Sequence, residues 1–183
     1  LGLYYSHWID WNDKRSWDHT NEIYGLDPDL YDDYWQEKVI PQMTELLTNY
    51  GEISIIWFDM WIHHSKTIVK KEQLFQLKEL IRKLQPKCLI NSRLGLSIEE
   101  DSDVDFRTLG DNQLGKEKLE YPWQTPATIA NSWGFNANEY RWKSTTSILK
   151  ALIGNVSLNG NLMLNIGPRY DGSLRYESLL RLN

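Results

Sequence analysis

The stretch Ile53-Ser54-Ile55-Ile56-Trp57-Phe58-Asp59 decides the fold, because it is an apolar run that ends on a carboxylate. A run that is apolar on both faces predicts a strand buried on both sides, as in a parallel sheet covered by helices. A helical pattern and the helix breaker Gly51 precede it. Asp59 is therefore expected at the carboxyl end of a parallel strand, where α/β folds place their chemistry. A capping role for Asp59 in the next turn fits its position equally well.

Strand and helix patterns alternate along the rest of the chain. Strands are expected at residues 1–6, 53–59, 88–91, 104–108 and 161–166, with a further short element from 128. Helices are expected over 30–50, 71–84 and 144–156, and from about 173 onward. Pro41 should kink or split the first helix. Residues 109–125 are expected to be irregular, and the long aromatic loop before Asp29 is a candidate binding loop.

This alternation predicts βαβ units and a parallel sheet, and therefore an α/β fold. Polar side chains recur where strands end, as in a (β/α)8 TIM-like barrel, at Ser6, Asp59, Arg93, Asn131 and Asn165. No glycine-rich phosphate loop follows a strand, which argues against a dinucleotide-binding fold.

The number of strands bears on how much of a barrel is present. With about four to six strands instead of eight, residues 1–183 are expected to be a partial catalytic barrel domain, its C-terminal part. The chain also begins inside a strand pattern and stops inside a helical one, as an excerpt would. The missing N-terminal half of the barrel is then an expected partner.

Composition narrows the classes of partner. The net charge of −5 is mild and has no basic stripe, so no nucleic acid is expected. No apolar run approaches the ~20 residues that cross a bilayer, so no membrane is expected. Residues 101–105 resemble half a calcium loop but lack its glycine and distal glutamate, so neither a metal nor another cofactor is expected. The single Cys88 excludes an internal disulfide.

Aromatic residues are abundant, with nine tryptophans and ten tyrosines, several of them in the expected loops. Packing alone explains many of these rings. Rings interleaved with Asp, Asn and Arg at strand ends also suit a polar ligand with apolar faces, and sugars are such ligands.

Five short motifs carry a family resemblance over essentially the whole chain. They are Leu3-Tyr4-Tyr5-Ser6 with Asp10-Trp11, Trp57-Phe58-Asp59, Asn91-Ser92-Arg93, Asn131-Ser132-Trp133-Gly134-Phe135, and Leu164-Asn165-Ile166-Gly167-Pro168 with Asp171-Gly172. In this order they resemble the motifs of the α-L-fucosidases of glycoside hydrolase family 29.

The resemblance implies a retaining exo-glycosidase that removes terminal α-L-fucose from glycans through a covalent glycosyl-enzyme. It implies that Asp59 is the nucleophile, that Arg93 holds sugar and nucleophile, and that Tyr4 lies near the nucleophile. Trp57 is expected to pack in the barrel or to lie near the sugar. The family's sugar-binding histidines lie upstream of this chain, so His63 and His64 are expected to be a solvated loop pair. Only the resemblance selects fucose over glucose or galactose.

A retaining glycosidase also needs a second carboxyl group, about 5–5.5 Å from the nucleophile. Many relatives carry a glutamate directly after the tryptophan that corresponds to Trp123, where this chain has Gln124. A glutamine supplies neither an acidic proton nor a base. Gln124 is expected to occupy the acid/base position, which would make the chain a catalytically silent fucose-binding relative. Alternatively, the acid lies upstream or is one of three loop residues, Asp111, Glu117 or Glu120; a fragment inactive by itself is the remaining possibility.

Overall fold

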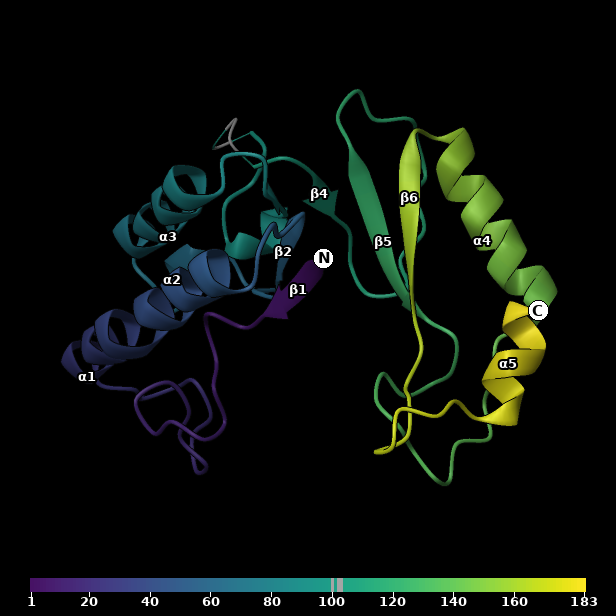
Figure 1. The fold of residues 1–183 in the computed structure, drawn as a ribbon, viewed down its shortest axis with the longest axis horizontal. Helices are drawn as coiled ribbons and strands as arrows, with labels where there is room; N and C mark the ends of the chain where they lie inside the picture. The colour runs from purple at the N-terminus through teal and green to yellow at the C-terminus, as the bar shows by residue number, and fades with distance from the viewer. Residues whose placement is uncertain (100, 102–103) are drawn as a thin grey trace. The chain divides into compact units, whose positions relative to one another are not determined.

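The computed structural model describes residues 1–99, 101 and 104–183, in two compact units, Leu1–Phe106 and Arg107–Asn183. Each unit contains one three-stranded parallel sheet with helices beside it (Figure 1). The α/β class expected from the alternating patterns is confirmed. None of the helices in the described part of the chain is long and apolar enough to cross a membrane.

The sheet of the first unit contains β1 (Gly2–Tyr5), β2 (Ile55–Phe58) and β3 (Leu89–Ile90), in that order. β2 is central and parallel to both neighbours, with Tyr4 opposite Trp57 and Ile90 opposite Ile56. Three of the four β2 residues are buried, as the apolar run predicted. The carboxyl ends of the three strands therefore meet at one edge of the sheet, where Asp59 follows β2 directly.

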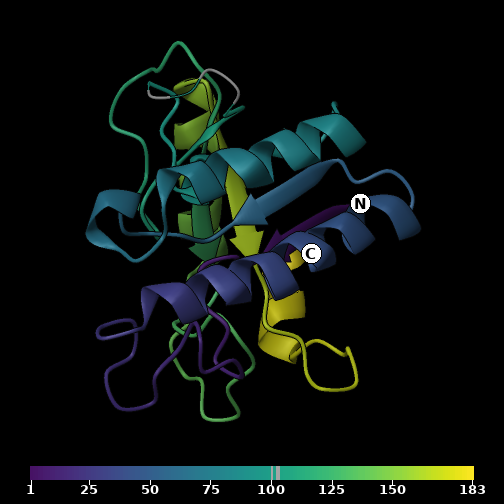
Figure 2. The same cartoon turned by 90° about the vertical axis from the view of Figure 1, so that its left-hand side faces the viewer.

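Helices cover one face of this sheet (Figures 1 and 2). They are α1 (Pro28–Tyr34), the π-helical segment η1 (Trp35–Val39), α2 (Ile40–Asn49) and α3 (Lys71–Leu84), with short 3₁₀ turns η2 (His64–Lys66) and η3 (Ser92–Leu94). The core between helices and sheet includes Tyr31, Trp35, Ile56, Leu74 and Leu77, all fully buried. The periodic pattern over 71–84 predicted α3 with its observed bounds.

Pro41 splits the first helix, as expected, but through a π-helical segment and not a gap. Pro41 lies in the first turn of α2, where its missing N–H leaves one i→i−4 hydrogen bond unformed. The adjacent Ile40 N–H instead reaches the carbonyl of Trp35, five residues back. The helical segments α1, η1 and α2 therefore follow one another without a break.

The second unit contains β4 (Arg107–Thr108), β5 (Trp123–Thr128) and β6 (Gly160–Asn165), parallel and in that order. Helix α4 (Thr145–Ser157) lies along β6, and α5 (Tyr176–Leu182) ends the chain (Figure 1). The Ser144 side chain caps α4 by accepting from the Ser147 N–H. The last helix begins at Tyr176 instead of near Ser173.

Strand β5 corrects the expectation that residues 109–125 are irregular and that a short element begins only at Thr128. Pro126 lies in the middle of this central strand, a position that a proline normally excludes. Its ring nitrogen is on the β4 side, because the Pro126 carbonyl accepts from the Asn112 N–H on that side. β4 ends at Thr108, so no ladder carbonyl there is left without a donor.

Candidate active site

Three strand ends bring the predicted site residues of the first unit together. Tyr4 is the third residue of β1, Asp59 follows the last residue of β2, and Arg93 lies in the 3₁₀ turn that follows β3. The Met60 N–H donates to the Arg93 carbonyl at 2.8 Å, which ties the turn to the chain after Asp59. Residues separated by 55 and 34 positions in the sequence thus meet at one carboxylate.

Each carboxylate oxygen of Asp59 accepts from a different donor. The Tyr4 hydroxyl donates to Oδ2 at 2.8 Å, and Arg93 Nη1 donates to Oδ1 at 2.7 Å. The Arg93 and Asp59 side chains are 11% and 20% exposed. A charge-assisted bond in such a site is stronger than an exposed ion pair, and it fixes the orientation of the carboxylate. Asp59 is therefore a positioned anion that remains accessible from solvent, and not a helix cap.

Trp57 connects the two donors. Its indole stacks on the Tyr4 ring with centroids 5.7 Å apart, and the Arg93 guanidinium lies 5.2 Å from its ring centroid. The residue is 7% exposed, whereas Tyr4 is 63% exposed. Trp57 therefore packs against the two groups that hold Asp59, and its contact with a sugar stays a prediction.

Asn91 supports strand β2 next to Asp59 in a way that sequence reasoning missed. Strand β3 has only two residues, and beyond it the fully buried Asn91 side chain makes the hydrogen bonds to β2. Its Oδ1 accepts from the Phe58 N–H at 2.8 Å, and its Nδ2 donates to the Phe58 carbonyl at 3.0 Å. The amide thus imitates a strand backbone next to Asp59. An asparagine closing a buried strand was the only available signal.

We expect Asn91→Leu to lower the free energy of unfolding by about 2–4 kcal/mol, because two buried backbone groups of Phe58 lose their partners. Denaturant unfolding measures the change. Asn49→Ala, at an exposed position on α2, is the control and should remain within about 0.5 kcal/mol of the parent. An Asn91→Leu variant as stable as that control would contradict the bracing role.

His7 is a second buried polar group near the site. It is fully buried, donates from Nε2 to the Leu94 carbonyl at 2.9 Å, and packs edge-on against Phe58 with ring centroids 4.9 Å apart. Burial lowers the pKa of His7 from 6.5 to about 4, against the smaller raising effect of the Leu94 carbonyl. The imidazole is therefore neutral at pH 7 and links the chain after β1 to the Arg93 turn.

This pKa makes stability depend on pH. Between about pH 4 and pH 6.5 the unfolded chain binds the proton and the folded chain does not, so folding loses stability as the pH falls through this window. The loss at pH 4 should be about 3 kcal/mol. Unfolding between pH 4 and 7 should show this slope, and His7→Gln should remove it, whereas the exposed His19→Gln should keep it. An unchanged slope in His7→Gln would overturn the assignment, and NMR titration of the parent imidazole tests it if that variant does not fold.

His63 and His64 lie next to each other in the loop after β2. The exposed His63 caps the η2 turn by accepting from the Ser65 N–H, and its ring centroid lies 4.3 Å from that of His64. This agrees with the expected loop pair. Among the described residues no group of three or more His, Cys, Asp or Glu side chains is arranged to hold a metal ion.

The acidic tract that resembled half a calcium loop is only partly described, since residues 102 and 103 lie outside the described residues. Its flanking carboxylates pair with α3 instead. Asp101 pairs with Lys78 at 2.5 Å, and Asp105 pairs with Arg82 at 2.7 Å.

The candidate acid/base residues all lie in the second unit. Gln124 is the half-buried second residue of β5, opposite Thr108 and Asn161. Asp111 is exposed and follows the end of β4 by three residues. Glu117 and Glu120 are exposed in the loop before β5.

Hydrogen bonds between Asn112 and β5 place Asp111 and Gln124 at different levels along the sheet. The Asn112 N–H donates to the Pro126 carbonyl at 2.8 Å, and the Thr128 N–H donates to the Asn112 side chain at 3.2 Å. Asp111 is thus next to the carboxyl end of β5, while Gln124 lies four residues before that end, about 13 Å along the strand.

Two further motifs also meet in this unit. Asn165, the last residue of β6, donates to the Trp133 carbonyl at 2.7 Å and to the Thr128 hydroxyl at 3.2 Å. A Cβ on Gly167 would lie 2.7 Å from the Gly134 backbone, so this close approach requires glycine. Asn131 follows the end of β5 by three residues and is exposed.

Parallel strands with an aspartate side chain held by hydrogen bonds at their carboxyl ends are typical of α/β enzymes. A family model described as alpha-L-fucosidase matches residues 1–183. The chain belongs to the α-L-fucosidase family, whose members are glycoside hydrolases.

Individual relatives agree with this assignment. The crystal structure of an α-L-fucosidase from Vibrio sp. strain EJY3 is 32% identical, with a TM-score of 0.84 over 99% of this chain and 32% of that one. An α-L-fucosidase from Lactobacillus casei, solved with its α-L-fucose product, is 30% identical, with a TM-score of 0.79 over 99% of this chain and 57% of that one. The Dictyostelium discoideum α-L-fucosidase is 26% identical over 81% of this chain, which spans 32% of that protein.

Proposed function

We propose that this chain is part of an enzyme that removes terminal α-L-fucose from glycans with retention of anomeric configuration. Family membership supports fucoside hydrolysis. The Lactobacillus casei relative was solved with α-L-fucose, and a variant of it with Fucα(1,6)GlcNAc, which supports a fucosylated glycan as substrate.

The observation that carries this proposal is the Asp59 carboxylate held by Tyr4 and Arg93. An ionised carboxylate at this point can attack the anomeric carbon, so that a bond from Asp59 forms while the bond to the leaving-group oxygen breaks. Water then attacks the same carbon and releases Asp59. Arg93 stabilises the negative charge before attack and after release, and the Tyr4 hydroxyl keeps the second oxygen oriented.

The leaving group needs a proton from a second carboxyl group. The register of the second unit supports Asp111 over the Gln124 position, because catalytic groups of parallel sheets lie at the carboxyl ends of strands and Gln124 lies near the amino end of β5. We therefore propose Asp111 as the general acid and base. Glu117 and Glu120, in the loop that precedes the amino end of β5, have less support.

We also propose that residues 1–183 belong to a (β/α)8 barrel whose N-terminal strands lie outside this chain. Parallel sheets with polar strand ends support it. So do four exposed apolar side chains on α4, which a larger domain would cover: Leu149, Leu152, Ile153 and Val156. The absence of nucleic-acid and membrane partners remains a prediction from composition.

A fucose-binding protein without turnover is the second candidate, favoured by Gln124 at the position where the family resemblance implies a glutamate. It becomes the better account if neither Asp111 nor another carboxyl group supplies the proton. Binding would then persist, because loss of general acid catalysis costs about 10²–10⁴-fold in rate without removing recognition.

A stereochemical time course on the full-length protein tests the proposal. We expect ¹H NMR during hydrolysis of an aryl α-L-fucoside to show α-L-fucose first, with the β-anomer rising later by mutarotation. The β-anomer first would exclude a covalent intermediate. A burst of about one equivalent followed by a stall would mean that Asp59 attacks but no base completes the cycle, and no release at all would favour the binding-only candidate.

A further inference from the structure

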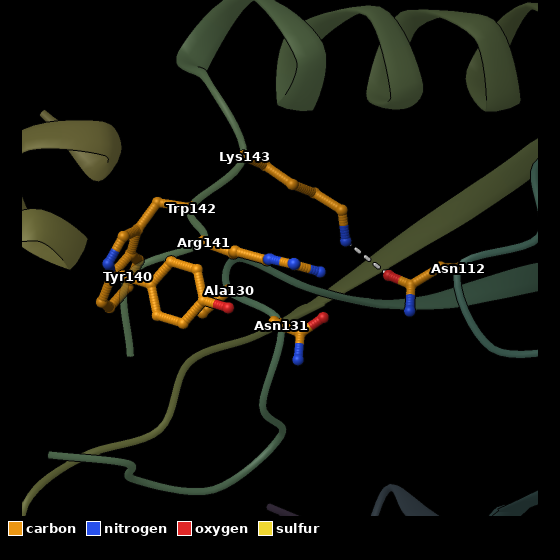
Figure 3. A pocket seen from close by; sticks show the side chains of 7 residues that line it. All are labelled: Asn112, Ala130, Asn131, Tyr140, Arg141, Trp142 and Lys143. Atoms are coloured by element: carbon orange, nitrogen blue, oxygen red, sulfur yellow. Dashed lines mark hydrogen bonds between the residues drawn. The ribbon is translucent and has the colours of Figure 1, made fainter. Parts of the chain in front are cut away.

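A pocket of about 520 Å³ in the second unit has no assigned function (Figure 3). It lies beyond the carboxyl ends of β4 and β5, where the chain after each strand contributes to its wall. Its lining residues are Asn112, Ala130, Asn131, Tyr140, Arg141, Trp142 and Lys143. In the proposed mechanism, the leaving group lies next to Asp111, and Asn112 is the adjacent residue.

A short antiparallel pairing of residues 129–131 with residues 141–143 forms the wall of this pocket. Ala130 bridges Trp142, and the Asn131 N–H donates to the Arg141 carbonyl at 3.0 Å. Side chains alternate along such a segment, so Arg141 and Lys143 point to one side and Trp142 to the other (Figure 3). The two cations therefore reach into the same space.

The charge of the pocket is positive. Two of its seven lining residues are cations, and none is acidic. Lys143 is anchored by donating to the Asn112 side chain and to the Thr128 carbonyl, at 2.5 Å each. The Arg141 guanidinium lies 5.3 Å from the centroid of the Tyr140 ring.

Glu139 is the acidic residue just before the lining segment 140–143. The Glu139 carboxylate accepts from the backbone N–H groups of Ser132, Tyr140 and Arg141, at 2.8, 3.0 and 2.9 Å. These three bonds occupy the Glu139 carboxylate, and Glu139 is not among the residues that line the pocket. An anion in the pocket would therefore face Arg141 and Lys143 first.

We propose that this pocket binds the leaving-group saccharide and selects glycans that carry an anionic substituent, a sulfate ester or a carboxylate, close to the fucosyl residue. Tyr140, 77% exposed, offers a ring face to the sugar. The amide groups of Asn112 and Asn131 suit its hydroxyls, and Arg141 suits the anion, since a guanidinium matches planar or tetrahedral oxyanions. The link to the leaving group rests on the proposed fucosidase function.

Calorimetric titration of the full-length protein tests the charge selection without any turnover. The ligands are N-acetylglucosamine, N-acetylglucosamine 6-sulfate, glucuronic acid and inorganic sulfate, at 20 and 200 mM salt. We expect one or both anionic sugars to bind about tenfold more tightly than N-acetylglucosamine at low salt, and the preference to shrink at high salt. Arg141→Gln should remove the preference, whereas Lys150→Gln, which removes an exposed cation on α4, should keep it.

Each outcome decides the matter. Tighter binding of the sulfated sugar alone, or of the uronic acid alone, supports the proposal and identifies the anion. Equal binding of all three sugars, a preference retained in Arg141→Gln, or inorganic sulfate binding as tightly as the sugar sulfate overturns it. Because Asp59→Ala should abolish hydrolysis and leave this preference intact, a failure of the fucosidase proposal is seen separately.

Discussion

Asp59→Asn is expected to lower kcat/KM for an aryl α-L-fucoside by on the order of 10⁴-fold or more, the scale seen when a covalent nucleophile is removed. The amide keeps the size of the side chain and can still accept a hydrogen bond from Arg93, but it has no negative charge with which to attack the anomeric carbon. Folding should be little affected, because the Asp59 side chain lies at the edge of the core and not within it.

Two further variants separate this effect from misfolding. Asp33→Asn, at an exposed position on α1, should retain full activity. Asp59→Gly should regain turnover in azide and give fucosyl azide of inverted configuration, because the anion then replaces the missing carboxylate in a single displacement. Near-normal turnover of Asp59→Asn in a folded protein would show that another group attacks the sugar.

The position of Asp59 at the end of a buried strand could be predicted from the sequence because its signal is local. An apolar run of strand length and a terminal carboxylate are both contained in Ile53–Asp59, and no distant residue is needed to interpret them. Helix α3 and the Ser144 cap of α4 were predictable for the same reason, since periodicity and capping act over a few residues. Tyr4 and Arg93 could be assigned to the site only through the family resemblance, because the register of the sheet, and no local pattern, brings them to Asp59.

What the sequence did not predict depends on contacts made elsewhere in the fold. A proline normally excludes a central strand. Pro126 is tolerated in β5 because β4 is short, so no ladder carbonyl lies opposite the missing N–H. That the Asn91 side chain continues a two-residue strand follows only from its hydrogen bonds with Phe58. The pocket beside Arg141 depends on the crossing of residues 129–131 with 141–143, and no periodic pattern marks it.

The second large effect concerns Asp111. Asp111→Asn should lower turnover of a fucosylated oligosaccharide by about 10²–10⁴-fold, because the sugar leaving group needs a proton. The first chemical step on an aryl fucoside with a reactive leaving group should be nearly unchanged. The covalent intermediate should then accumulate, because the amide introduced by this substitution cannot activate water. Azide should relieve that stall and give fucosyl azide of retained configuration.

Two variants of the same unit make this result specific to Asp111. Glu117→Gln, which removes a carboxylate from the loop before β5, should leave the turnover of both substrates unchanged. Gln124→Glu should not raise activity if Asp111 is the acid, because position 124 lies near the amino end of β5. If Gln124→Glu instead raises turnover of the oligosaccharide while Asp111→Asn changes nothing, the acid/base position is that of Gln124. The parent chain would then be a binding protein with a nucleophile but no acid, and the strand-end argument for Asp111 would fail.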